Sequence, residues 1–446
     1  MHSSVSLGPT GKCPSRTSSM PDQAGLEWVE GTWGEQRPQW TKEPSLDIVL
    51  QIACHHLGLA TSPETTIAFL SQGGFNKLFK ITCSIGNFVM RVSLPVDPFY
   101  KTASEVTTLD LIQHHTTIPV PTVIAHDASN ENELGFEWIL MEYVSGVTLD
   151  EAWTMMTWLE KCKLVERIVD ISSQLFRLRS ETIGNIYRAD DPVPNISDRS
   201  IPDDHGVSSK YMMGRIVSMP FFWATRLSLD IHRGPFKSSM DWLMTRLALL
   251  KHDTEQPLPS DADSDDGEEI DLNREMITLL LRLMPHFFPA DVEESEGFGL
   301  RHDDISRRNI MVEPYTGELT ALVDWECVSM VPLWKVCQLP WVLISRERTT
   351  EPQKHRYTHE GNETDELYFI HLEEYEKTCL RQLFFEHMAK LEPAWMEIHR
   401  LSEAKADFDY AVENCDCEIH RKQIRTWLEN VVAGKEQDSL RALMLK

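Results

Sequence analysis

An aspartate, an asparagine and a second aspartate stand at a spacing that constrains this chain more than any other feature. The first two occur in His302-Asp303-Asp304-Ile305-Ser306-Arg307-Arg308-Asn309, and the third opens Asp324-Trp325-Glu326. Asn309 follows Asp304 by five residues, so a tight loop lets both side chains face one ligand. Residues 310–312 and 319–323 are predicted to form two short strands joined by a turn, which place Asp324 at a strand end beside Asn309.

These residue types suit phosphoryl transfer. In that reaction one carboxylate sits at the acceptor hydroxyl, and two oxygen-bearing side chains hold Mg²⁺ on the nucleotide phosphates. We expect Asp304 to be the catalytic base, or the group that orients the acceptor hydroxyl. His302 is expected to be structural and to form a hydrogen bond with the backbone near the loop.

A glycine turn and a buried cation are expected upstream. Gly73 and Gly74 separate two predicted strands, and a flexible turn lets the backbone approach phosphates. Arg91 interrupts the apolar strand predicted at 88–94, where a buried charge needs a partner. Glu105, on the next predicted helix, can supply it. The alternative is that Arg91 reaches solvent at the strand edge.

The predicted elements divide the chain into an α+β arrangement of two lobes. Residues 1–44 are expected to be a disordered tail, 45–144 a small antiparallel β lobe, and 145–446 a helical lobe. The helical lobe is expected to contain the catalytic loop 302–326 and a disordered acidic insertion at 255–269. The segments predicted to be helical are 45–58, 102–115, 149–180, 239–252, 271–288 and 365–445. The strands predicted in the β lobe are 65–70, 76–84, 88–94, 120–125 and 136–143.

The composition excludes several kinds of partner. The formal net charge of −26 argues against nucleic-acid binding and against adhesion to an anionic membrane, since both require clustered Lys and Arg. No apolar run reaches the ~18 residues of a membrane span. Nine scattered cysteines without zinc-ligand spacing indicate a reducing compartment, so we expect a cytoplasmic protein. A mitochondrial location is the alternative, because residues 1–21 resemble a transit peptide in lacking acidic residues.

Residues 65–345 resemble the aminoglycoside phosphotransferase and choline kinase group of the protein-kinase-like superfamily, which is common in filamentous fungi. The resemblance includes the glycine turn, the catalytic-loop motifs and the hinge Ile139-Leu140-Met141-Glu142-Tyr143-Val144-Ser145-Gly146. It implies a two-lobed protein-kinase-like fold. It also implies ATP as the nucleotide, with adenine near Glu142 and Val144. By the same resemblance Arg91 stands at the nucleotide-binding lysine, Glu105 is its helix partner, and Asn309 and Asp324 bind Mg²⁺.

Two departures from that family leave alternatives open. Arg91 replaces a lysine with a wider, planar cation, and Asp303 places a second acid beside Asp304. The leading hypothesis is an ATP- and Mg²⁺-dependent phosphotransferase that acts on a hydroxyl of a small molecule. The alternatives are a catalytically impaired kinase-like protein that binds a nucleotide or a partner, and an atypical protein kinase. Asp324-Trp325-Glu326 in place of Asp-Phe-Gly argues against the protein kinase. The acceptor and the oligomeric state stay open.

Overall fold

The computed structural model describes residues 23–31, 36–60, 64–191, 210–256, 264–289, 297–357, 364–435 and 438–445. The chain forms two compact units, and each unit combines segments that are distant in sequence. The first unit comprises Met1–Gly146, Ser180–Phe236 and Thr320–Met330, and the second comprises Val147–Arg179, Lys237–Leu319 and Val331–Lys446. The first division, after Gly146, lies close to the expected lobe boundary at 144. The later segments of the first unit were not part of the expected 45–144 lobe.

A five-stranded antiparallel sheet is the centre of the first unit. Its strand order is β3-β4-β5-β7-β6. The strands are β3 (Thr66–Gln72), β4 (Asn76–Cys83), β5 (Gly86–Ser93), β6 (Val123–Asp127) and β7 (Glu137–Glu142). The predicted hairpin is present, because β4 and β5 pair from Asn76↔Ser93 to Cys83↔Gly86. Apolar side chains of one sheet face, among them Phe79, Ile81 and Met90, form the core.

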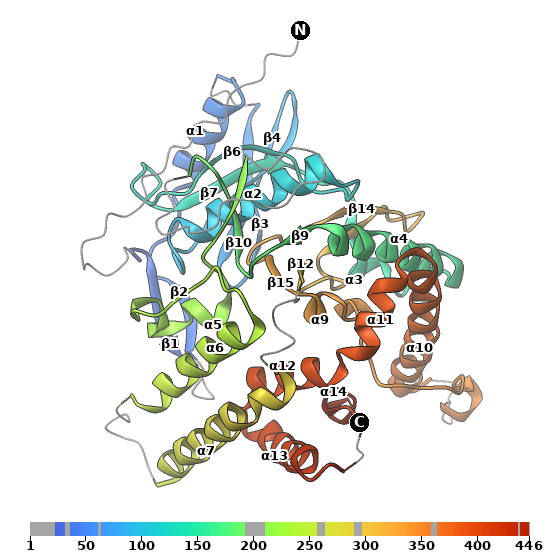
Figure 1. The fold of residues 1–446 in the computed structure, drawn as a ribbon. Coiled ribbons are helices and arrows are strands. Elements are labelled where there is room, and N and C mark those ends of the chain that lie inside the picture. The colour runs from blue at the N-terminus through green and yellow to red at the C-terminus, as the bar shows by residue number, and fades with distance from the viewer. Residues whose placement is uncertain are drawn as a thin grey trace. The chain divides into compact units, whose positions relative to one another are not determined.

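Helix α2 (Tyr100–His115) packs against β6 and β7 of this sheet (Figure 1). Ala103, Val106, Leu109 and Ile112 recur at helical spacing and are all buried. The helix is buried on further sides as well, so Lys101 and Glu105 are only 1% and 2% exposed. Two charged side chains are therefore enclosed on the first turns of this helix, and each requires a partner of opposite charge.

The N-terminal segment corrects one expectation. Residues 26–40 were predicted to belong to a disordered tail, but β1 (Leu26–Glu30) and β2 (Gln36–Trp40) pair as an antiparallel ladder. The ladder is held by aromatic packing, since the Trp40 and Phe136 rings lie 5.1 Å apart and the Trp28 and Trp223 rings 5.0 Å apart. Residues 1–22 of the expected tail lie outside the described residues.

The second unit is mainly helical. Its long helices are α4 (Trp158–Arg177), α6 (Ser239–Thr254), α7 (Ser264–Phe287), α10 (Glu366–Leu391), α12 (Glu403–Asn414) and α13 (Glu418–Val432). Helix α4 begins with a capping box between Thr157 and Glu160, and α10 packs along it (Figure 1). The predicted α+β class, with an antiparallel N-terminal sheet and a helical C-terminal region, is confirmed. Among the described residues, no helix is both long and apolar enough to cross a membrane.

Helix α7 corrects the expectation of a disordered insertion at 255–269. The helix begins at Ser264 and includes the acidic residues that follow. Glu269 also forms an ion pair with Arg421 on α13, with 3.0 Å between Oε1 of Glu269 and Nη2 of Arg421. Residues 257–263 of the predicted insertion lie outside the described residues.

The remaining elements are short. In the first unit they are α1 (Leu46–His56), β10 (Asn185–Arg188), β11 (Tyr211–Gly214) and α5 (Met219–Phe222). In the second they are β8 (Val147–Thr148), α3 (Leu149–Ala152), β12 (Phe298–Arg301), β13 (Ile310–Val312), α9 (Leu333–Val336), α11 (Pro393–Leu401) and α14 (Leu440–Met444). At the joins between the units lie β9 (Arg179–Ser180), β14 (Leu319–Leu322) and β15 (Ser329–Pro332).

Candidate active site

Arg91 lies on β5, an inner strand of the sheet, and is only 4% exposed. The alternative in which it reaches solvent at the strand edge is therefore wrong. Its Nη1 forms an ion pair with Oε1 of Glu105, as predicted from the sequence. Its Nη2 forms a second ion pair with Glu326 and lies 3.4 Å from Oδ1 of Asp324. Burial by itself lowers the pKa of Arg91, but these three carboxylates raise it above its ordinary value.

Two further residues belong to this cluster and were missed from the sequence. Lys101 Nζ lies 2.6 Å from Oε2 of Glu326 and 3.0 Å from Oδ1 of Asn76. Asn76 Nδ2 donates a hydrogen bond of 2.8 Å to the same Glu326 oxygen. The signal for Lys101 was its position four residues before Glu105, which places both side chains on one face of α2.

The cluster holds more acidic than basic groups, because Glu105, Asp324 and Glu326 surround two cations. Burial raises the pKa of Glu105 above its ordinary value, although Arg91 and Lys101 oppose the shift. Its Oε2 is buried and accepts no hydrogen bond from any residue that the structure describes. Burial likewise opposes ionisation of Glu326, but Lys101 and Arg91 lower its pKa below the usual range. Glu326 is therefore the ionised partner of both cations.

Asp324 has a backbone conformation that is rare for a residue with a side chain. Its φ is +64°, in the left-handed region, where L-residues other than Asn and Asp are seldom found. The next residue, Trp325, is 1% exposed and donates its indole Nε1–H to the carbonyl oxygen of Leu322 at 2.9 Å. The turn is thus fixed on the buried indole, while the Asp324 side chain stays 42% exposed.

The catalytic-loop residues belong to the second unit, where Asp304 and Asn309 are in direct contact. Asn309 is buried, and its Nδ2 donates to the backbone oxygen of Asp304 at 3.0 Å and to Oδ2 of Asp304 at 2.7 Å. The Asp304 side chain is exposed. Because both bonds use the amide nitrogen, the carbonyl oxygen of Asn309 is the atom that suits a cation. His302 is buried, and its Nδ1 accepts from the Asp304 amide at 3.3 Å, which confirms its structural role.

Neighbouring basic groups keep Asp303 in its charged form. Its carboxylate points to Arg301, whose Nε lies 2.5 Å from Oδ1, and its side chain is 62% exposed. Desolvation opposes ionisation here, but Lys335 and Arg301 lower the pKa of Asp303 below its ordinary value. Arg301 Nη1 also donates to the carbonyl oxygen of Lys335. The second acid of the motif is thus kept charged by basic groups of its own unit.

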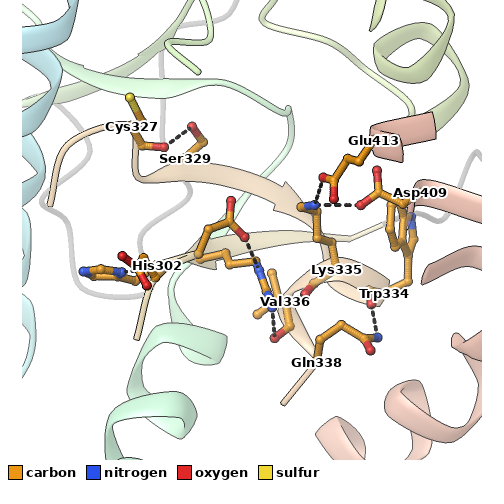
Figure 2. Close-up of polar contacts among 12 residues, drawn as sticks. His302, Cys327, Ser329, Trp334, Lys335, Val336, Gln338, Asp409 and Glu413 are labelled. Carbon is orange, nitrogen blue, oxygen red and sulfur yellow. Dashed lines mark hydrogen bonds and ion pairs between the residues drawn. The ribbon is translucent and has the colours of Figure 1, made fainter. Parts of the chain in front are cut away.

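Lys335 connects this loop to a buried cluster of charges. Figure 2 shows its ammonium group between the carboxylates of Asp409 and Glu413, at 2.6 Å and 3.0 Å. Asp409 also forms an ion pair with Arg246 of α6, and both residues are 4% exposed. Trp242 lies under this pair, with Arg246 4.9 Å from its ring centre. The cluster therefore links α6, α9 and α12 of the second unit.

The predicted nucleotide-binding positions outside the charged cluster are all in the first unit. Gly73 and Gly74 form the turn between β3 and β4, with Gly73 N–H bonded to the carbonyl of Asn76 at 2.9 Å. A side chain added at either glycine would meet open space, so the turn leaves room for a ligand. Glu142 ends β7 and is exposed, and Val144 follows it half-buried.

The donor chemistry fits Mg²⁺, which is usually held by one or two protein oxygens together with substrate phosphates. Asp324 offers a partly exposed carboxylate in the first unit, and Asn309 offers an amide oxygen in the second. Within the part of the chain that the structure describes, His, Cys, Asp and Glu side chains form no group of three or more that would suit a metal.

Comparison with known proteins gives relatives of low identity. A subtelomeric hrmA-associated cluster protein of Aspergillus fumigatus is 25% identical over 334 residues, which are 64% of this chain and 62% of that protein. The mitochondrial protein named altered inheritance of mitochondria protein 9, from Saccharomyces cerevisiae, is 21% identical over 331 residues, 65% of this chain and 52% of the yeast protein. The chain thus spans less than two thirds of either relative's length.

Solved structures give a weak likeness over most of the chain. The ternary complex of APH(2″)-IIa with streptomycin and ATP is 12% identical, with a TM-score of 0.45, over 90% of this chain and 99% of the other. A protein of Ralstonia eutropha, whose structure carries the description of an aminoglycoside phosphotransferase, is 13% identical with a TM-score of 0.42. The match covers 90% of this chain and 97% of the other. Neither structure bears on the activity of this chain at these values. The model of the family described as "Phosphotransferase enzyme family" matches residues 66–335, and the chain therefore belongs to this phosphotransferase family.

Proposed function

We propose that this protein transfers the γ-phosphate of ATP to a hydroxyl group of a small molecule, with Mg²⁺ as the metal. The observation that carries the proposal is the contact between Asp304 and Asn309. An exposed carboxylate is held by a buried amide at 2.7 Å, in a loop whose residue types are those of phosphoryl transfer. The family match over residues 66–335 supports the same reaction class.

Asp304 is proposed to act on the acceptor. Its carboxylate accepts the hydroxyl proton, or orients the hydroxyl, while the acceptor oxygen bonds to the γ-phosphorus. The bond from that phosphorus to the bridging oxygen breaks, and ADP leaves. Asn309 fixes the carboxylate oxygen Oδ2, and Oδ1 is the oxygen proposed to act on the acceptor. Such positioning accounts for much of the rate that a phosphotransferase provides.

The nucleotide is proposed to bind at the glycine turn and the hinge of the first unit. Adenine lies against the backbone near Glu142 and Val144, and the turn at Gly73 and Gly74 covers the phosphates. Asn309 and Asp324 hold Mg²⁺, which when bound neutralises charge on the phosphate oxygens. The open space at the glycine turn supports this assignment, because backbone can approach a phosphate closely there.

A second candidate function is favoured by one observation. The guanidinium of Arg91 is already paired with carboxylates through both terminal nitrogens. A kinase-like protein that binds a nucleotide or a partner without transferring phosphate would tolerate this arrangement. The two candidates differ in turnover and agree on nucleotide binding.

The test compares binding with turnover. Thermal unfolding with Mg²⁺ and ATP reports binding, and a panel of hydroxyl-bearing metabolites with γ-labelled ATP reports transfer. Asp304→Ala is expected to abolish transfer and to keep nucleotide binding, while Asp303→Asn keeps measurable transfer. Binding without transfer to any acceptor would favour the second candidate, and equal turnover by wild type and Asp304→Ala would sink the first.

A further inference from the structure

The cations of the first unit face carboxylates of their own chain. Arg91 Nη1 bonds to Glu105 and Nη2 to Glu326, and the side chain is only 5% exposed. A cation that binds phosphate directly must present free donors to the ligand. In Arg91, each terminal nitrogen already forms an ion pair with a carboxylate of the same unit, Glu105 or Glu326.

Lys101 is enclosed in the same way. Its side chain is 1% exposed, and its ammonium group contacts Glu326 at 2.6 Å and Asn76 at 3.0 Å. Asn76 is itself fixed, because Ser93 Oγ donates to its Oδ1 at 2.8 Å. These residues lie on β4, β5 and α2, so the donors that surround Glu326 come from rigid elements.

Glu326 therefore receives three donors on a single carboxylate oxygen, Oε2. They are the Arg91 guanidinium, the Lys101 ammonium group and the Asn76 amide. Glu326 lies two residues after Asp324, and Trp325 between them is buried. The turn is thus held at Trp325 and at Glu326, and the left-handed backbone of Asp324 follows from both attachments.

We infer that Arg91 and Lys101 are positioning residues that hold Glu326 and, with it, Asp324, which Arg91 also contacts at 3.4 Å, instead of contacting the nucleotide phosphates. The 42% exposed Asp324 carboxylate is then the group through which the cluster meets the bound nucleotide. This inference rests on the proposed function, because it assigns the cations a role in the same nucleotide site. It also gives Lys101 a role in nucleotide binding, beyond the stability that its buried ion pair with Glu326 contributes.

The inference distinguishes the nucleotide affinity that requires metal from the affinity that remains without metal. A cation that touches phosphate directly contributes to binding with or without metal. A cation that acts through Asp324 would contribute only when the metal is present, because Asp324 would serve as a metal ligand. Removal of a residue that orients a metal ligand typically weakens metal affinity by about 10- to 100-fold.

The experiment titrates ADP into the full chain, once with Mg²⁺ and once with EDTA. Lys101→Met is expected to weaken Mg²⁺-dependent ADP binding by about tenfold or more. Metal-free ADP binding should stay within about twofold of wild type, since no phosphate contact is lost. Lys161→Met is the matched control, because Lys161 is also a buried lysine with one carboxylate partner, Glu376 at 2.7 Å.

A second variant keeps the test independent of folding at the helix. Glu326→Gln removes the same ion pairs from the loop side and should show the same loss that depends on Mg²⁺. The double variant with Lys101→Met should lose no more than the worse single variant, since both changes break one connection. Additive losses would show that Lys101 and Glu326 act separately.

Three further results overturn the inference. Equal weakening with Mg²⁺ and with EDTA would mean that the cations bind phosphate directly. Wild-type behaviour of both Lys101→Met and Glu326→Gln would remove the positioning role. A wild-type chain that binds ADP under neither condition would refute the proposed function and this inference together. ADP binding without phosphate transfer would refute only the proposed transfer reaction.

Discussion

Asn309 holds Asp304 at two points, the backbone oxygen at 3.0 Å and the carboxylate oxygen Oδ2 at 2.7 Å. One amide group thereby fixes both the loop and the side chain that the loop presents. The contact is internal to the second unit, so residues of the loop itself hold this geometry. We therefore expect a substitution of Asn309 to affect the turnover rate more than the stability of the fold.

Asn309→Ala should lower turnover by about 100-fold, because a carboxylate that moves by about 1 Å loses its alignment with the acceptor. The free energy of unfolding should fall by only about 1–2 kcal/mol, the cost of a lost hydrogen bond. Steady-state kinetics and urea unfolding measure the two effects. Tyr315→Ala, at a 90% exposed residue of the following turn, is the control. Unchanged turnover in Asn309→Ala would remove the assigned role.

The backbone of Asp324 predicts a difference between two substitutions. Asp324→Asn keeps a residue that tolerates φ of +64°, whereas Asp324→Ala adds about 1 kcal/mol of backbone strain. Both variants should lose Mg²⁺-dependent nucleotide affinity, since neither has the carboxylate. Only Asp324→Ala should show the additional loss in thermal unfolding. Equal stabilities would mean that the left-handed conformation costs nothing here.

The buried cluster around Asp409 predicts unequal costs for two carboxylates that share Lys335. Asp409→Ala leaves Arg246 and Lys335 without their buried partner, which should cost about 3–5 kcal/mol. Glu413→Ala, at a side chain 42% exposed, should cost at most about 1 kcal/mol. Urea unfolding of the two variants gives the comparison. Similar small losses would show that the cluster is hydrated.

Glu137 predicts a dependence of stability on pH. Its carboxylate is 2% exposed and accepts the Phe99 amide at 2.7 Å, and burial raises its pKa to about 7. Its folded-state pKa is above the unfolded value, so folding favours the protonated form. The stability it contributes is complete below about pH 4.3 and is lost as the pH rises through 7.

Glu137→Gln should therefore gain stability relative to wild type between pH 5 and pH 8, by about 1–3 kcal/mol. The amide keeps an acceptor for Phe99 and does not titrate. Urea unfolding at several pH values across this range tests the sign as well as the size. A stability difference between wild type and Glu137→Gln that does not change with pH would contradict the raised pKa.

The sequence predicted those parts of the site that follow local rules. A charge within an apolar strand requires a partner, and Glu105 was the first acid of the next predicted helix, so the pair with Arg91 was predictable. The loop contact between Asp304 and Asn309 followed from their spacing. The Glu326 contacts with Lys101 and Asn76 were not predictable, because Asn76 and Glu326 are separated by 250 positions. Such partners are set by the fold and leave no periodic pattern.

The missed elements have similar causes. The hairpin at 26–40 depends on Trp28 and Trp40 packing against side chains far along the chain. The start of α7 was obscured because acidic residues mark both solvated segments and first helical turns. Composition alone does not separate these two cases. In the sequence Asp303 is a second acid beside Asp304, and its contact with Arg301 appears in the structure.

The segment Thr320–Met330 belongs to the first unit although half of the second unit's sequence separates it from Arg91. During synthesis, Arg91 and Lys101 therefore leave the ribosome long before Glu326, which lies 235 positions after Arg91. Until then two cations of a forming core have only Glu105 as an acidic partner in this cluster. We expect the first unit to mature late, and a chain cut before residue 320 to expose its sheet to proteases and chaperones.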